Sequence, residues 1–455
     1  MPVVPLRRLP GALRCSLLAF SASLALAGAA QAQSLLPLYD AARSYDAPYQ
    51  SARAQAEAAL YKAEQSRALK RPSVNGTLTW AENRNSTPYS STTLTRTGQQ
   101  SAGVTALYAI YNRSNDKTIA QAERAIEVAR SQLDGVEQDL IVRLVQAYFD
   151  VLASADALAT VQTGKKAIAE QLASAKRNFE VGTATITDTR EAQARFDLST
   201  AQELAAENDL NVKRLALESV VGRAGVVPKT MAVPVVLPAL APADIEDWVR
   251  QADALSPTLQ QLRIAREVAK LETEKARAGG LPTVGVSAGL TEAYTRLSGS
   301  TAAGAFPSNS GAGLSGNAAI QLNMPLFTGG AVQNRIKETL ALEDKAQSDL
   351  EAARRGVAQA TRSAFFGVRS LIAQVAALEA AESSSKLALD ATLLGYKVGV
   401  RVNLDVLNAQ TQLYQAQRDL AKARYDVVVN SLKLRQISGQ LQPQDVNAVE
   451  ALLAR

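Results

Sequence analysis

Two aspartates at matching positions of a repeated stretch are the side chains best placed to do chemistry. Asp188 lies in the segment 179–193, and Asp405 lies in the segment 396–410, which matches the first at a constant offset of 217 residues. Each aspartate follows a Val-Gly pair and opens a new periodic segment. Glycine after a helical run supplies a left-handed stop, and a carboxylate can cap the helix that follows. The stretch therefore predicts two helix–turn–helix tips, each carrying a carboxylate.

The composition offers little else for catalysis. The chain has no histidine, and its single cysteine is Cys15. No side chains converge with the spacing of a metal site, no cofactor is expected, and an enzyme is the least expected class. The formal net charge of +6 falls to +3 without residues 1–32, which carry three arginines and no acidic residue. A charge this small gives no reason to expect nucleic acid as a partner.

Residues 1–32 have the features of a secretory signal peptide. Three arginines accompany an apolar run over 17–30, and the small-residue pattern at 30–32 is typical of a cleavage site. We therefore expect these residues to be removed on export. Cys15 precedes most of the apolar run, so it cannot become the lipid-bearing first residue of the mature chain.

The constant offset divides the mature chain into two structural repeats. The first covers 33–222 and the second covers 244–455, and a linker rich in proline and valine lies between them at 223–243. The linker is the most apolar later stretch, but its four prolines exclude a helix that spans a membrane. If the protein crosses a membrane, it must do so with strands.

Each repeat has the same predicted order of elements: helix, strand, loop, strand, long helix, tip and returning helix. The apolar spacing predicts helices over 34–70 (with a break near Pro48), 113–179, 188–221, 244–278, 331–396 and 403–438. Apolar residues recur every seven positions in the long and returning helices, which is typical of coiled coils. The strictest example is the series Val406, Leu413, Leu420, Val427 and Leu434.

Four short segments alternate apolar and polar residues, as strands with one apolar face do. They lie around 74–80, 104–110, 284–290 and 318–324. The intervening segments 81–100 and 296–313 are rich in Ser, Thr, Asn and Gly and are predicted to be exposed loops. Membrane barrels need about eight strands or more, and open edges are not tolerated in lipid. Either the sheet lies in water, or several chains pool their strands into one barrel.

The repeat order and several motifs resemble the TolC family of outer-membrane secretion and efflux channel proteins. The motifs are Phe149 and Phe366 in the long helices, the Leu-Phe-Thr-Gly-Gly run at 326–330 and the two tips. The resemblance implies a mainly α fold with a small β part. It implies a homotrimer whose four strands per chain form a 12-stranded outer-membrane barrel, continued by an α-helical tunnel across the periplasm.

The resemblance also implies roles for residues at the tips. Asp188, Tyr396 and Arg401 would form a clasp that holds the periplasmic mouth closed, and Asp405 would form a carboxylate ring in the pore. The second ring position carries Asn408 where the family pattern has aspartate, so only one such ring is expected. Adaptor proteins of the periplasm would dock at Val181, Gly182 and Thr183 in the first tip and at Val398, Gly399 and Val400 in the second.

Several alternatives stay open. A helix cap is the plainer interpretation of both aspartates. The implied function is an exit duct that serves an adaptor and an inner-membrane pump or ABC transporter, but a free-standing porin would share the barrel, and a soluble coiled-coil scaffold would share the helices. The cargo, protein or small molecules, does not follow from these residues.

Overall fold

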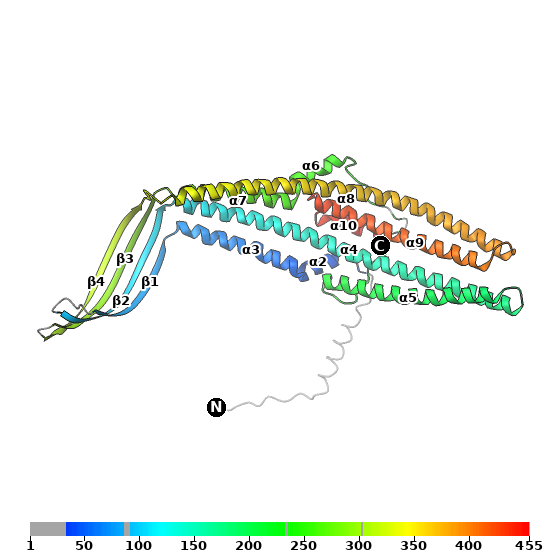
Figure 1. The fold of residues 1–455 in the computed structure, drawn as a ribbon, viewed down its shortest axis with the longest axis horizontal. Helices are drawn as coiled ribbons and strands as arrows, with labels where there is room; N and C mark the ends of the chain where they lie inside the picture. The colour runs from blue at the N-terminus through cyan, green and yellow to red at the C-terminus, as the bar shows by residue number, and fades with distance from the viewer. Residues whose placement is uncertain (1–32, 86–91, 233–234, 236, 302–303, 455) are drawn as a thin grey trace, which may run out of the picture. The chain divides into compact units, whose positions relative to one another are not determined.

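A computed structural model of the chain describes residues 33–454 apart from 86–91, 233–234, 236 and 302–303 (Figure 1). The predicted signal peptide lies outside the described residues. The chain forms two compact units. One, the tip unit, comprises Met1–Ser51, Gly135–Ser256 and Gly356–Arg455, and the other, the sheet unit, comprises Ala52–Asp134 and Pro257–Arg355. Both sequence repeats contribute to both units.

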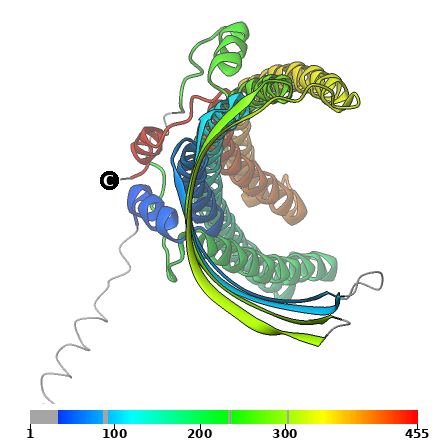
Figure 2. The same cartoon turned by 90° about the vertical axis from the view of Figure 1, so that its left-hand side faces the viewer.

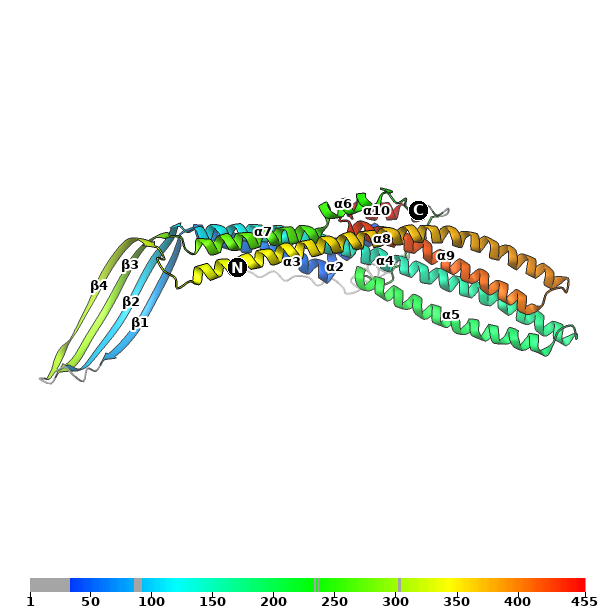
Figure 3. The ribbon, with the colours of Figure 1, turned by 45° about the horizontal axis from the view of Figure 1, so that its top comes forward.

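The sheet unit contains one antiparallel sheet in the order β1-β2-β3-β4, which curves in the view of Figure 2. Its strands are β1 (Ser73–Asn85), β2 (Thr92–Tyr111), β3 (Thr283–Thr301) and β4 (Gly304–Asn323). The first two come from one sequence repeat and the last two from the other, and β2 pairs with β3 (Figure 3). The two edges of the sheet are therefore β1 and β4.

The strands are longer than predicted, and the loops predicted over 81–100 and 296–313 were largely wrong. Most residues of both segments continue the ladders, which run to the pair Asn85–Thr95 between β1 and β2 and to Thr301–Gly304 between β3 and β4. The sequence is polar there on both faces of the sheet, so it lacks the apolar alternation of a half-buried strand. A polar composition indicates that the side chains are exposed. The backbone hydrogen bonds between paired strands form whether the side chains are polar or apolar.

One face of the sheet is apolar, as the alternation predicts. Because alternate residues share a face, the even-numbered side chains of all four strands lie together wherever the register is regular, that is, between the shifts near the strand ends. This apolar face carries the exposed large residues Val74, Leu78, Trp80, Val104, Tyr108, Leu290, Tyr294, Leu314, Ile320 and Leu322. Leu78 is 89% exposed, so in a single chain this face lacks the apolar environment that its composition requires.

Helical segments lead into and out of the strands within the sheet unit. They are the later part of α3 (Ala47–Arg67) with the short helix η1 (Ala68–Lys70), the first part of α4 (Arg113–Glu180), α7 (Pro257–Ala278) and the first part of α8 (Ala331–Lys397). Ion pairs join neighbouring helices, including Lys117 to Glu274 and Arg335 to Glu272 at 2.7 Å. The Arg335–Glu272 pair is partly exposed, and exposed ion pairs contribute about 0–1 kcal/mol each.

The tip unit consists of two helix hairpins and short elements packed on them. The later part of α4 pairs with α5 (Ile186–Val221), and the later part of α8 pairs with α9 (Asn403–Ile437). The other helices are α2 (Leu35–Tyr45), α6 (Ile245–Leu255) and α10 (Gln444–Glu450). The predicted seven-residue series of α9 is confirmed, because Val406, Leu413, Leu420, Val427 and Leu434 are all buried.

The bounds of the long helices were predicted closely. Of the helices predicted to open the two repeats, the one over 34–70 has the predicted break, whereas the one over 244–278 has a break that was not predicted. The break near Pro48 is confirmed and lies at Asp46. The helix predicted over 244–278 is interrupted at Ser256, whose backbone is extended (φ −57°, ψ 122°). Pro257 is the cause, since a proline disfavours the helical conformation of the residue before it and lacks the N–H that a continuous helix needs.

Asp46 fixes the junction between α2 and α3. Its carboxylate receives two hydrogen bonds of 3.0 Å from the Arg143 guanidinium and one of 3.0 Å from the Tyr49 N–H. Burial alone would raise the pKa of Asp46, but these hydrogen bonds outweigh burial and lower it below the ordinary value. Helix α2, the first helix among the described residues, is thereby joined to α4 by a charged and partly buried contact.

Candidate functional site

The two predicted tips have the same backbone. The first turn contains Val181 and Gly182, the second contains Val398 and Gly399, and the two glycines have φ values of 76° and 79°. In the first tip Thr183 N–H donates to Asn178 O at 2.8 Å, and in the second Val400 N–H donates to Gly395 O at 2.9 Å. These are equivalent positions at the offset of 217. Only glycine adopts this left-handed conformation without strain, so both tips depend on it.

Apolar side chains are exposed at both tips. Val181 is 72% exposed in the first tip, and Val398 and Val400 are 66% and 78% exposed in the second. Exposure of a valine side chain to water is unfavourable, and a cluster of exposed apolar side chains is a common feature of a binding surface. The two Val-Gly turns thus present matching apolar edges.

Asp188 caps α5 through a reciprocal pair of contacts with Thr185. The Thr185 N–H and Oγ1 both donate to Asp188 Oδ2, at 2.9 and 2.7 Å, and the Asp188 N–H donates to Thr185 Oγ1 at 3.2 Å. This is a capping box. The plainer interpretation of Asp188 as a cap is therefore confirmed, and in one chain its carboxylate is used at the start of α5.

Asp405 has the matching position at the start of α9 and a second partner. Val402 N–H donates to its Oδ2 at 3.4 Å, and the same oxygen lies 3.6 Å from an Arg401 guanidinium nitrogen. Gly395 makes room for this arginine, because a Cβ there would lie 2.8 Å from Arg401 Cγ. Arg401 and Asp405 are thus neutralised within one chain by an exposed pair, which is weak enough to exchange.

Near the tips, two hydrogen bonds between described residues join the hairpins to each other. Asn178 Nδ2 on α4 donates to Tyr396 Oη on α8 at 3.3 Å, and Arg195 on α5 donates to Asn408 Oδ1 on α9 at 3.1 Å. Sequence reasoning missed Asn178 and Arg195. Asn178 could have been found, because the offset of 217 makes it the equivalent of Gly395, and both residues lie shortly before the glycine of their turn.

The structure places all predicted site residues at or next to the two tips of one unit, but it gives each clasp residue a different partner. Asp188 contacts Thr185, Tyr396 contacts Asn178, and Arg401 contacts Asp405. The clasp and the pore ring therefore stay predictions about contacts between chains.

The comparisons with known proteins cover almost the whole chain. The family model described as "Outer membrane efflux protein" matches residues 38–223 and 248–440. The outer membrane protein TolC of Vibrio cholerae is 33% identical over 428 residues, which is 94% of this chain and 95% of the relative. The alkaline protease secretion protein AprF of Pseudomonas aeruginosa is 33% identical over 339 residues, 74% of this chain and 68% of the relative.

Solved structures show the same fold. A crystal structure of CusC, described in connection with transmembrane channel formation, superposes with a TM-score of 0.75 at 17% identity and covers 90% of this chain and 92% of that one. The open-state structure of the MtrE outer membrane channel of Neisseria gonorrhoeae gives a TM-score of 0.70 at 18% identity, with 90% of each chain covered.

Proposed function

Since the chain belongs to the outer membrane efflux protein family, we propose that three copies of it assemble into one duct with a closable periplasmic mouth. The protein is an outer-membrane channel with a periplasmic tunnel, and its family is one of transport channels. What the proposal adds is the number of chains, the residues of the mouth and the surface that meets an adaptor.

The open apolar sheet is the observation that carries the proposal. Four strands have two free edges, at β1 and β4, and a face of exposed leucine, isoleucine and tryptophan. Unpaired backbone groups of an edge strand are too costly in hydrocarbon, so the sheet must close. Three copies supply twelve strands if β4 of one chain pairs with β1 of the next, which lies within the range of known membrane barrels.

Exposed apolar series on the tip-unit helices support the same assembly. On α5 the exposed residues Leu198, Ala205 and Val212 are seven positions apart. On α8 the exposed series is Phe366, Ala373, Ala380, Leu387 and Leu394. Both have the spacing of a coiled-coil contact surface that is unoccupied in one chain. We propose that α5 of one chain packs against α8 of its neighbour and closes the tunnel wall.

Two long helices are long and apolar enough to span a membrane, if length and composition alone are considered. Helices α4 and α8 each contain an 18-residue window that is long and apolar enough, but only 39% and 17% of these windows are buried in one chain. A neighbouring chain in the tunnel wall would cover the apolar surface of α8. This accounts for its composition without placing a helix in lipid.

The mouth of the duct lies at the tips in this proposal. Asp188, Tyr396 and Arg401 would exchange their partners within one chain for partners in a neighbouring chain, and three copies of Asp405 would surround the pore. A ring of carboxylates attracts cations. Asn408, which accepts from Arg195, adds no charge to this ring, so one carboxylate ring is proposed.

The exposed turns at Val181–Thr183 and Val398–Val400 are the proposed docking surface for a periplasmic adaptor, through which an inner-membrane pump or ABC transporter delivers cargo. The family name concerns efflux, and the name of AprF concerns protease secretion. The proposal therefore covers both protein and small-molecule cargo, with the choice made by the pump. A free-standing porin would leave the two matching apolar tips without a partner.

Two measurements test the proposal. Chemical cross-linking of the purified protein in detergent should give a ladder that ends at the trimer, whereas a monomer that retains its strand content would contradict the assembly. Export from cells should stop when the adaptor gene is deleted while the duct remains in the outer membrane. Undiminished export without an adaptor would favour the porin.

A further inference from the structure

The charged residues of the four described strands all lie on the apolar face. They are Glu82, Arg84, Arg96, Glu292 and Arg296, and all have even numbers. Four of the five gather at one end of the sheet. In the register, Arg84 lies opposite Arg96, and Gly98 lies opposite both Glu82 and Arg296. Three guanidinium groups from three neighbouring strands thus occupy two adjacent rows of the sheet.

An aromatic row marks where the apolar part of this face ends. Trp80, Gln100 and Tyr294 lie opposite one another, one row closer to the helix-connected ends of the strands than Arg296. Rows of aromatic residues flank the apolar band of membrane barrels at both interfaces. Tyr108 lies on the same face at the opposite end of this band, eight residues along β2 from Gln100. This separation corresponds to about 27 Å along a strand, or about 20 Å across a membrane at the usual strand tilt.

This spacing fits the apolar thickness of an outer membrane, so the aromatic row lies at one interface. Since the strands join the helices at the Tyr108 end and the tunnel lies in the periplasm, the Trp80–Tyr294 row lies at the outer interface. Arg296 lies one row farther out, and Arg84 and Arg96 lie two rows farther out, about 5 Å and about 10 Å beyond the aromatic side chains. This is the level of the lipid headgroups in the outer leaflet.

Two of the three arginines, Arg96 and Arg296, line a hollow in the protein surface. A hollow of about 340 Å³ is lined by Trp80, Glu82, Arg96, Gly98, Gln100, Tyr294, Arg296 and Ser298. Gly98 lies opposite Arg296 and two positions along β2 from Arg96, and a Cβ there would meet nothing within 4 Å. The hollow therefore has open backbone next to both arginines.

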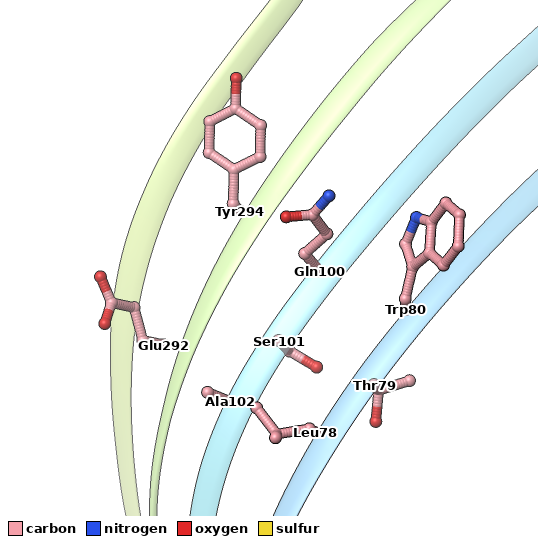
Figure 4. Close-up of a pocket in the computed structure, with 8 residues that line it drawn as sticks. All are labelled: Leu78, Thr79, Trp80, Gln100, Ser101, Ala102, Glu292 and Tyr294. Carbon is pink, nitrogen blue, oxygen red and sulfur yellow. The ribbon is translucent and has the colours of Figure 1, made fainter.

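A second hollow continues from the first toward the apolar band. It has a volume of about 470 Å³ and shares Trp80, Gln100 and Tyr294 with the first. Figure 4 shows Trp80 and Tyr294 on either side of Gln100, with Leu78 and Ala102 close together below them and Glu292 on β3. The first hollow is polar and basic, and the second adds the apolar side chains Leu78 and Ala102 next to Thr79, Ser101 and the carboxylate of Glu292. Together they suit a molecule with an anionic head and an apolar group that contacts Leu78 and Ala102.

The positive charge of the cluster is only partly balanced. Glu82 forms an ion pair with Arg96 and a second with Arg84 at 3.4 Å, so one carboxylate serves two arginines and Arg296 adds a third positive charge. Arg84 and Arg96 keep 65% and 54% of their side chains exposed. Guanidinium groups bind phosphate through paired hydrogen bonds, and a net positive cluster at the headgroup level attracts an anion.

We propose that Arg84, Arg96 and Arg296 form a binding site for the phosphate groups of an outer-leaflet lipid. Trp80 and Tyr294 would contact the region between headgroup and chain, and the hollow beside Leu78 and Ala102 would receive a chain. The inference rests on the proposed function only in that the sheet must be inserted in the outer membrane with this face toward lipid.

The test compares binding of three probes to the detergent-purified full-length protein by native mass spectrometry. The probes are lipid A with two phosphates, lipid A with one phosphate, and inorganic phosphate. The Arg96→Gln and Arg296→Gln variants are compared with Arg71→Gln, which removes an exposed arginine from the same unit outside the strands. Cross-linking to the trimer is measured on each variant, so that a failure of assembly is recognised separately.

We expect bisphosphorylated lipid A to bind the unaltered protein and Arg71→Gln equally. Its binding should fall about tenfold or more in each of the two cluster variants, since each loses a charge-assisted contact. The monophosphorylated lipid should bind more weakly, and inorganic phosphate should not compete at equal concentration. Equal lipid binding by cluster and control variants that still form trimers would overturn the site. Equal competition by inorganic phosphate would overturn the lipid as its ligand.

Discussion

Arg195 on α5 donates a hydrogen bond to Asn408 on α9 across 3.1 Å, and so joins the two hairpins of the tip unit next to the proposed pore ring. In this hydrogen bond the donor, Arg195, is charged and the acceptor, the Asn408 amide, is neutral. An aspartate at 408 would face a guanidinium at the same distance and would form an ion pair, so the position can accept a carboxylate without rearrangement of either helix.

Asn408→Asp should therefore add a second carboxylate ring to the pore. We expect block of the channel by a trivalent cation, measured in planar bilayers, to become stronger than in the unaltered protein. Removing the neutralising partner as well, with Arg195→Gln, should strengthen the block further. Unchanged block in the double variant would show that residue 408 does not face the pore.

The exposed valines of the two turns should be needed for adaptor binding. Val181→Asp and Val398→Asp place a charge on surfaces that are already exposed, so the free energy of unfolding should change by less than about 0.5 kcal/mol. Export should nevertheless fall strongly, because a desolvated charge is unfavourable in an apolar interface. The control is Leu60→Asp, which changes an exposed apolar residue on α3 outside the tips. Normal export by both tip variants would contradict the docking assignment.

The exposed series on α8 should be needed for assembly. Leu387→Glu leaves the single chain intact, since Leu387 is 71% exposed, but it places a charge in the proposed contact with a neighbouring α5. Cross-linking should then give less trimer. Ala381→Glu adds the same charge at an exposed position outside the series and should assemble normally. Equal assembly of the two variants would argue against the α5–α8 contact.

Asp46 should make the stability of the protein depend on pH in the acid range. Its pKa is lowered in the folded state, so its contribution is fully present above the ordinary carboxyl pKa of about 4 and is lost as the pH falls through the lower, folded value. The melting temperature of the unaltered protein should fall over this range. Asp46→Asn should lower it at neutral pH and flatten the acid dependence, whereas a parallel acid dependence in both proteins would assign the effect to other carboxylates.

The sequence predicted the helices better than the strands, for a physical reason. The long helices and their tips bury a regular series such as Val406 to Leu434, and this periodicity depends on the chain alone. The outer parts of the strands, such as 82–85 and 95–100, have polar side chains on both faces, so only their backbone pairing defines them. Pro257 indicates a break at Ser256, but the helical pattern on either side of it led to the prediction of one continuous helix.

The positions of the two tips were predicted, but the partners of their side chains within one chain were not. The offset of 217 located both tips and both caps, because capping depends on residues within one turn of a helix. The contacts of Asn178 with Tyr396 and of Arg195 with Asn408 join helices from different repeats. Their pairing depends on how the hairpins pack, and no local pattern encodes it.

The gate prediction concerns Tyr396 and Arg401, which have partners of their own within one chain. Arg401→Ser with Tyr396→Phe removes the guanidinium that lies 3.6 Å from Asp405 and the hydroxyl that accepts from Asn178 at 3.3 Å. Exposed contacts of this kind contribute about 0–1 kcal/mol each, so the trimer should stay folded while the closed mouth is weakened. Single-channel conductance in planar bilayers should rise. Lys397→Ser, an exposed neighbour of Tyr396, should leave the conductance unchanged. Unchanged conductance in the double variant, with the trimer intact by cross-linking, would refute the clasp and leave the fold and the duct as they are.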